Sequence, residues 1–299
     1  MENFALIFVA IFLGYVMGRM GAFSGEAPLV LNKFILYISA PALVLLQIPK
    51  LTLSLEVLIP VFLAWSVMAL SALTVFFISR FFAFSKEVTG SLMLVAVLGN
   101  TSYLGIPIVS AYFGNEALGY VLMYDQLGTF IALSTYGTFV SIYYASAKEI
   151  HMRLLLLKII SFPPFLALLA ALFLMGTVFP PIVESVLVSL SSTIVPLALV
   201  AVGLGLRFKL PKEEILPFSV ALVVKLIFAP IIAMALCALF GWHSLAANVS
   251  IMEASMAPMI TAAAVASMAG LAPRLSSAIV GYGIILSLGT TWVVHYLIT

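Results

Sequence analysis

Val97-Leu-Gly-Asn-Thr-Ser-Tyr-Leu-Gly-Ile-Pro-Ile108 is a polar, glycine-containing interruption inside an apolar run long enough to span a bilayer. Gly99 and Gly105 loosen the backbone, and Pro107 lacks an N–H group and clashes with the carbonyl four residues earlier. We therefore expect this helix to open near the middle of the membrane. Lipid offers no hydrogen bonds, so the freed backbone groups must bond to protein, water or a ligand.

A second interruption lies far downstream, in Met252-Glu-Ala-Ser-Met-Ala-Pro-Met-Ile-Thr261. Its proline, Pro258, again stands within an apolar run. Two broken helices at corresponding positions in two halves of a chain are typical of the binding site of a transporter.

The composition is that of a polytopic membrane protein. Of 299 residues, 64% are hydrophobic and only 8% are charged, whereas about a quarter of the residues of a soluble protein are charged. The net charge of +2 is small and spread over loops, which gives no basic surface for nucleic acid. Cys237 is the single cysteine, so an intrachain disulfide is excluded.

Hydropathy predicts ten membrane spans, all helical, because each window holds about 20 apolar residues. The basic residues fall almost entirely in alternate loops, and the opposite loops hold only Lys50. By the positive-inside rule both termini face outward from the cytoplasmic membrane. The windows are 3–19, 29–47, 58–82, 88–112, 117–144, 155–175, 181–205, 216–240, 246–268 and 275–297.

Short sequence words recur at a nearly constant offset. Pro41-Ala-Leu-Val44 resembles Pro196-Leu-Ala-Leu-Val200, an offset of 155, and Pro107 and Pro258 differ by 151. A repeat of this length holds five spans and divides the chain into residues 1–147 and 148–299. Because five is odd, the second repeat must be inverted in the membrane relative to the first.

Inverted repeats would bring the two interruptions together from opposite sides. The exposed N-terminus of a half-helix favours an anionic group, and its C-terminus favours a cation. The alternative is a purely structural role, in which the Ser and Thr hydroxyls only bond to carbonyls freed by the prolines. The candidate substrate-binding residues are Asn100, Thr101, Ser102, Tyr103, Pro107, Ser255, Met256, Pro258 and Thr261.

Three ionisable residues fall deep within predicted spans: Asp125, Lys225 and Glu253. A charge at the bilayer centre costs a few kcal/mol, so each side chain should face a cavity or a partner. One hypothesis pairs Lys225 with Asp125 or Glu253 as a structural contact. The other hypothesis makes one carboxylate a site that binds a proton or a cation and releases it again during transport.

The histidines give no sign of a metal site or of an enzyme. His151, His243 and His295 are scattered over two loops and a helix end, which favours surface or interfacial roles. Intramembrane proteolysis by Ser/His or paired Asp residues needs a deep His or a second Asp, and the chain has neither. We therefore predict a protein that is not an enzyme and that binds no resident metal or organic cofactor.

Gly99-Asn-Thr-Ser-Tyr-Leu-Gly-Ile-Pro107, followed by Tyr112-Phe-Gly114, resembles the fourth-span signature of the auxin efflux carrier family. The second, eighth and ninth spans of that family are similar to Tyr37-Ile-Ser-Ala-Pro-Ala-Leu43, Lys225-Leu-Ile-Phe-Ala-Pro230 and Ala254-Ser-Met-Ala-Pro258. The resemblance covers essentially the whole chain. The long loop between spans 5 and 6 of the plant auxin carriers is missing, as in a compact prokaryotic member.

The resemblance implies ten spans in two inverted repeats, with spans 4 and 9 crossing at their prolines near the membrane midplane. This fold is shared with bile-acid/sodium symporters and sodium/proton antiporters. It further implies a scaffold domain from spans 1, 2, 6 and 7, a transport domain from spans 3–5 and 8–10, elevator-type movement of one against the other, and a homodimer.

Plant members export an auxin and bacterial members are associated with small carboxylates, so the resemblance implies a small organic anion as substrate. Asn100 and the crossing prolines carry over as site candidates. Glu253 beside Pro258 would repel an anion unless it were protonated, paired with Lys225 or neutralised by a cation. Proton coupling, sodium coupling and uncoupled transport stay open, as does a cation-coupled carrier of a non-carboxylate substrate. A non-transporting membrane receptor is the third class.

Overall fold

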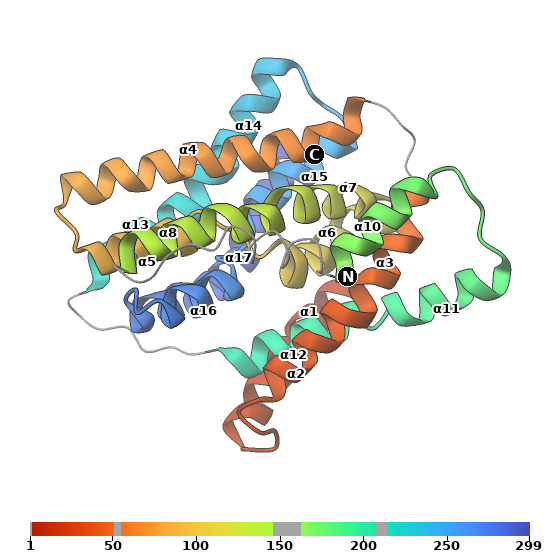
Figure 1. The fold of residues 1–299 in the computed structure, drawn as a ribbon, viewed down its shortest axis with the longest axis horizontal. Coiled ribbons are helices and arrows are strands. Elements are labelled where there is room, and N and C mark those ends of the chain that lie inside the picture. Colours follow the sequence, from red (N-terminus) through yellow and green to blue (C-terminus); the bar gives the residue numbers. More distant parts are fainter. Residues whose placement is uncertain (1, 51–54, 146–162, 207–213) are drawn as a thin grey trace.

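A computed structural model describes residues 2–50, 55–145, 163–206 and 214–299, and these residues form helices joined by short connections (Figure 1). Helices fall within all ten predicted windows. The boundary between residues 147 and 148, and the basic residues 148, 153, 158, 207, 209 and 212, lie outside the described residues.

One group of helices packs around α12 and α3. In Figure 1 α1, α2 and α12 lie together at the lower right, with α3, α10 and α11 above them. Gly14 of α1 lies against the backbone of α12 at Val200 and Gly203, where a side chain would not fit, so these two helices approach closely. The members are α1 (Glu2–Arg19), α2 (Ala27–Phe34), η1 (Ile35–Ser39), α3 (Ala40–Gln47), η2 (Ile48–Lys50), α10 (Pro163–Phe173), α11 (Pro181–Ser191) and α12 (Ile194–Gly205).

The remaining helices form a second group, in which α4 packs on α15 and α5 packs on α8 and α16. Its first half comprises η3 (Leu55–Leu58), α4 (Ile59–Phe81), α5 (Lys86–Val95), η4 (Thr101–Gly105), α6 (Ile106–Phe113), η5 (Asn115–Ala117), α7 (Leu118–Met123), η6 (Tyr124–Phe130), η7 (Leu133–Gly137) and α8 (Thr138–Ala145). Its second half comprises α13 (Ile215–Val223), η9 (Val224–Phe228), α14 (Ala229–Phe240), α15 (Leu245–Ala254), α16 (Ile260–Met268) and α17 (Pro273–Ile298).

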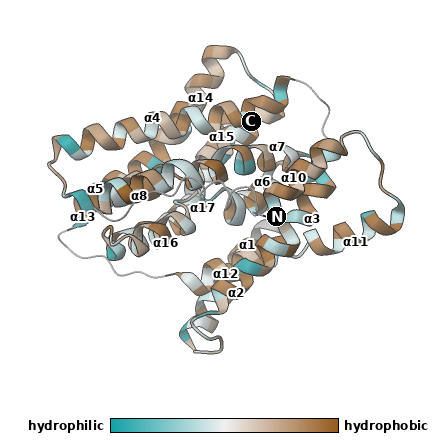
Figure 2. Ribbon diagram, in the orientation of Figure 1, coloured by the Kyte–Doolittle hydropathy of each residue, from teal (hydrophilic) through white to brown (hydrophobic). Residues whose placement is uncertain are grey.

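Five continuous helical segments of the described chain are long and apolar enough to cross a membrane. Figure 2 shows apolar residues along most helical surfaces and polar residues mainly near helix ends. Large apolar side chains such as Phe77 and Phe81 on α4 are exposed, as expected where lipid is the solvent. The protein is therefore a multi-pass membrane protein. The five segments are Ala27–Lys50, Leu55–Phe81, Pro181–Gly205, Ile215–Phe240 and Pro273–Ile298.

Three prolines within helices each follow a π-helical turn. The turns η1, η4 and η9 end two residues before Pro41, Pro107 and Pro230 respectively. A proline ring clashes with the carbonyl of the preceding turn, and a π turn contains an extra residue that lets that carbonyl move aside. The local sequence thus selects a widened turn at these places, and the helix continues through the proline.

The two interrupted helices cross, but not at both prolines. Between α5 and η4 the chain leaves the helix, and Gly99 forms an isolated antiparallel bridge with Pro258, between α15 and α16. The amide of Asn100 donates to the Ala257 carbonyl at 2.8 Å, and that of Met259 donates to the Leu98 carbonyl at 3.0 Å. The expected crossing at Pro107 is therefore wrong, because the π turn η4 absorbs that proline and the break falls at Gly99 instead.

Candidate site at the helix crossing

The crossing brings Lys225 of η9 against Gly99. The Lys225 ammonium donates to the carbonyl of Ala254, the last residue of α15, at 3.1 Å. A Cβ atom on Gly99 would lie 3.0 Å from Lys225 Nζ, so only glycine leaves full room for the ammonium group. The C-terminus of a helix carries partial negative charge. Lys225 therefore supplies a fixed cation to the end of the broken helix α15.

Glu253 lies against the second glycine of the span-4 motif. A Cβ atom on Gly105 would come within 2.5 Å of both carboxylate oxygens of Glu253. The Glu253 side chain is fully buried, and neither of its oxygens has a hydrogen-bond partner among the described residues. The two glycines that the sequence indicated as sites of backbone flexibility thus make room for charged groups of the second half of the chain.

The surroundings of Asp125, on η6, differ from those of Glu253. It accepts hydrogen bonds from the hydroxyls of Thr101 and Ser102, at 2.5 and 2.6 Å, and from Gln126 Nε2 at 2.6 Å. Only 3% of Asp125 is exposed. The carboxylate ties the start of η4 to span 5, and three donors offset much of the cost of burying it.

Asn100 is the capping residue at the start of η4 and is 1% exposed. Its Nδ2 amide group donates to no described residue. The first N–H groups of a helix likewise lack partners within the helix, and η4 and α16 both begin at the crossing. A buried, unused donor and two helix N-termini therefore lie at the crossing, and helix N-termini favour an anionic group.

The other candidate residues take different positions. Ser255 is buried, and its hydroxyl donates to the Met252 carbonyl at 2.6 Å. This matches the purely structural alternative, in which a hydroxyl bonds to a carbonyl freed by the helix break. Tyr103 and Met256 are buried near the crossing, whereas Thr261 on α16 is exposed. Lys225 forms no ion pair with Asp125 or Glu253, because its ammonium bonds to backbone instead.

Two features of the site were not predicted. Gln126 carries no charge and directly follows Asp125, so the sequence gives no sign of its role, yet it donates to that carboxylate. A cavity of about 20 Å³ also lies at the crossing and is lined in part by Gly99, Thr101, Lys225 and Glu253. A space of this size is enough for one water molecule.

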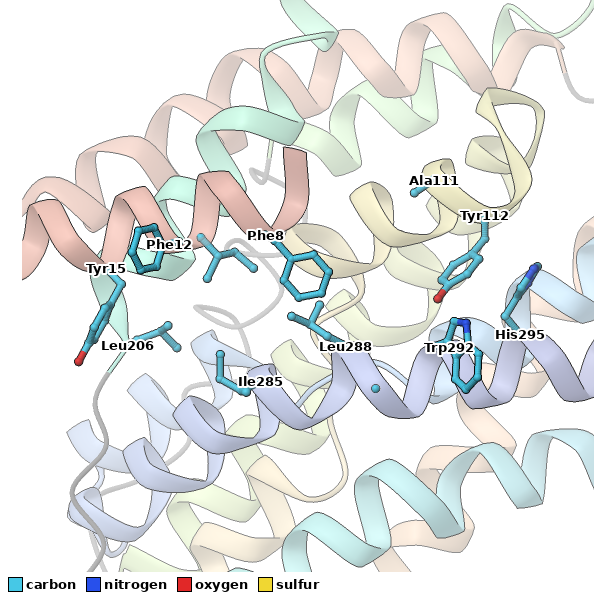
Figure 3. A pocket seen from close by; sticks show the side chains of 12 residues that line it. Phe8, Phe12, Tyr15, Ala111, Tyr112, Leu206, Ile285, Leu288, Trp292 and His295 are labelled. Carbon is cyan, nitrogen blue, oxygen red and sulfur yellow. The ribbon is translucent and has the colours of Figure 1, made fainter. Parts of the chain in front are cut away.

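A much larger space, of about 1080 Å³, lies between α1 and α17. Figure 3 shows Phe8, Phe12 and Tyr15 of α1 facing Ile285, Leu288 and Trp292 of α17, with Tyr112 of α6 and His295 at one end. The rings of Tyr112 and His295 are 4.2 Å apart. The lining contains no Lys or Arg and is mainly apolar, so we place the anion-binding chemistry at the crossing rather than in this groove.

Within the described residues, no group of three or more His, Cys, Asp or Glu side chains is arranged to hold a metal ion. His243 is exposed beside α15 and His295 lies at the end of α17, while His151 falls outside the described residues.

The chain is similar to known membrane transport proteins over nearly its whole length. Residues 1–295 match the family model described as "Membrane transport protein". An uncharacterized transporter of Methanocaldococcus jannaschii is 28% identical over 265 residues, covering 86% of this chain and 85% of the relative. An uncharacterized transporter of Methanothermobacter thermautotrophicus is 26% identical over 296 residues, covering 96% and 94%.

Proposed function

Because the chain belongs to the membrane transport protein family, that of the auxin efflux carriers, and is a transporter rather than an enzyme, we propose that it carries a small organic anion. The substrate carboxylate binds at the crossing of the two broken helices. The Asn100 amide and the backbone N–H groups at the starts of η4 and α16 hold it.

The observation that carries this proposal is the unused donor of Asn100. A buried amide group without a partner costs free energy, and the cost is recovered when a carboxylate accepts its hydrogen bond. Thr101 and Ser102 are already bonded to Asp125, so their hydroxyls hold the loop in shape and leave Asn100 as the side chain that faces the substrate.

The proposed architecture is ten spans in two inverted five-span repeats. It is supported by the contact between Ser39 Oγ and Thr193 Oγ1, at 2.6 Å. These residues are 154 positions apart, close to the repeat offset of 155 between Pro41 and Pro196. Two residues that are equivalent in a pair of repeats and touch each other are those expected near a two-fold axis.

Elevator movement is supported by two clefts between the helix groups. One of about 620 Å³ is lined by α3, α11 and α12 on one side and by α6 and α7 on the other. The second, of about 220 Å³, lies between α2 and α12 and the pair α16 and α17. The first contains Lys50, in a predicted outer loop, and the second contains Pro28, on the basic side. Spans 3–5 and 8–10 would move past spans 1, 2, 6 and 7 to open each cleft in turn.

In this account the carrier works in the cytoplasmic membrane with both termini outside, as a homodimer. It needs no organic cofactor, and its remaining partners are lipid, the substrate and a coupling proton or sodium ion.

Uptake of a panel of radiolabelled mono- and dicarboxylates into proteoliposomes tests the function. We expect at least one acid to be taken up, and Asn100→Ala to lower its uptake at least tenfold while the protein stays monodisperse. Asn248→Ala, which changes the same residue type at the far end of α15, is the matched control and should transport normally. Unchanged uptake by Asn100→Ala would remove the crossing as the site.

A cation-coupled carrier of a non-carboxylate substrate is the second candidate, and the buried Glu253 carboxyl favours it, since a negative charge repels an anion. Uptake driven by a proton or sodium gradient for neutral or cationic solutes, without uptake of any organic acid, would favour this candidate.

A further inference from the structure

Within the described residues, Glu253 is the carboxyl at the crossing whose oxygens accept no hydrogen bond. Asp125 has three donors, whereas both oxygens of Glu253 lie against Gly105 and have none. A buried carboxylate that is neither paired nor hydrogen-bonded is costly, and such a group takes up a proton instead. The three donors therefore favour the anion of Asp125, whereas Glu253 lies in a place that suits the neutral acid.

Lys225 acts on Glu253 only through its charge, which favours the carboxylate but satisfies neither of its oxygens. Its ammonium donates to the Ala254 carbonyl and makes no ion pair with Glu253. It also lines the 20 Å³ cavity that borders Glu253. A sodium ion in that cavity would be repelled by the ammonium group, whereas a proton forms a covalent bond with a carboxylate oxygen of Glu253. The cavity accordingly suits a proton or a neutral water molecule better than a sodium ion.

The charged and titratable groups around Glu253 are few. The charges of Asp125 and Lys225 act on Glu253, and the charge of Glu253 in turn acts on the Tyr124 hydroxyl. The other charged and titratable side chains on elements that pack against α15 are Glu56, Arg80, Tyr103, Tyr112, Glu116, Tyr120, Arg274, Tyr282, His295 and Tyr296, together with Cys237.

We propose that Glu253 is the proton-binding carboxyl of the carrier and that one proton enters with each organic anion, an inference that rests on the proposed function. When Glu253 is deprotonated, Asp125, Glu253 and Lys225 together carry one net negative charge, which repels the substrate. The Glu253 carboxylate binds one proton from the aqueous phase and becomes a carboxylic acid. The cluster is then neutral, and the Asn100 amide and the helix N-termini accept the anion.

Loss of the proton on the other side restores the negative charge and expels the anion. This coupling explains why a carboxyl stands at a site for an anion. It also predicts that the substrate KM rises with pH, while a sodium gradient has no effect.

Glu253→Gln copies the neutral acid and tests the coupling. In proteoliposomes, wild-type protein should accumulate the acid found in the panel several-fold more with an inward proton gradient than without. In Glu253→Gln this ratio should fall to one, and exchange of labelled for unlabelled acid should continue at a pH-independent rate. Glu26→Gln, an identical change at an exposed position, should keep the wild-type ratio. A Glu253→Gln protein that still responds to the proton gradient would overturn the proposal.

Infrared spectroscopy gives a readout that does not need transport. At neutral pH the wild type and Asp125→Asn should both show the absorption of a protonated carboxyl, and Glu253→Gln should lack it. If Glu253→Gln does not fold, Glu253→Asp should shift the band. Absence of the band from the wild type, or its loss in Asp125→Asn, would contradict the assignment. Failure of the wild type to carry any organic acid would refute the proposed function, while the infrared result would still decide the proton site.

Discussion

The small cavity at the helix crossing and the large groove between α1 and α17 differ in every respect that bears on function. The first has about 20 Å³ and is bordered by Lys225, Glu253 and Thr101, and the second has about 1080 Å³ and is bordered mainly by aromatic and aliphatic carbon. Volume alone would favour the groove as the substrate site. The chemistry of the lining favours the crossing, because a bound carboxylate must exchange its water for hydrogen-bond donors, and the groove offers few.

If the substrate binds at the crossing as proposed, its site is nearly closed in this state. Substrate would enter through a cleft that opens when one helix group moves. The groove is bordered by the exposed apolar side chains Phe12 and Trp292, which lipid can cover. Substitutions should therefore be costly at the crossing and mild in the groove.

The largest effect is expected from Gly105→Ala. The added methyl group would lie 2.5 Å from both oxygens of Glu253, so the carboxyl must move or the broken helices must separate. We expect at least a tenfold loss of transport and a loss of stability of about 1–3 kcal/mol, measured by uptake and by thermal unfolding in detergent. Gly289→Ala is the matched control in the groove, because nothing lies within 4 Å of its added Cβ. Equal behaviour of the two variants would contradict the contact.

A smaller effect is expected from Asp125→Asn. Asparagine keeps an acceptor for Thr101 and Ser102, but it loses the charge that strengthens their bonds and cannot accept from Gln126 with its amide nitrogen. The expected cost is about 1.5–3 kcal/mol of stability, together with reduced transport. Ser102→Ala, which removes one of the three donors, should cost less in the same unfolding assay. A cost for Ser102→Ala as large as that of Asp125→Asn would contradict the expectation that each of the three bonds contributes a share of the stability.

The smallest effect is expected from Trp292→Ala. This side chain is 62% exposed on the lipid side of the groove, so its removal takes away little packing within the protein. Substrate uptake should stay within about twofold of the wild type. A loss comparable to that of Asn100→Ala would move the substrate from the crossing into the groove.

Much of this arrangement could be predicted from sequence because it follows from local chemistry. Apolar windows locate the helices, and Gly, Asn and Pro within two of them locate the breaks. The scarcity of charge in the spans made Asp125, Lys225 and Glu253 stand out as residues that need partners. Asn100 was among the candidates because it precedes the motif's hydroxyl residues.

The contacts between the breaks could not be predicted, because they depend on packing across more than a hundred residues. Periodicity does not reveal that Gly99 meets Pro258, or that Gly99 and Gly105 make room for Lys225 and Glu253. The crossing was assigned to Pro107 because a proline normally breaks a helix, whereas the π turn η4 takes up the strain. Whether a helix adopts that turn depends on the neighbours that bond to Thr101 and Ser102.

The most direct test of the account is a density map of the protein with its transported organic acid bound. We expect density for the acid between Asn100 and the start of α16, within hydrogen-bond distance of Asn100 Nδ2. Density for the acid in the groove between Tyr15 and His295, with the crossing unchanged, would contradict the central claim.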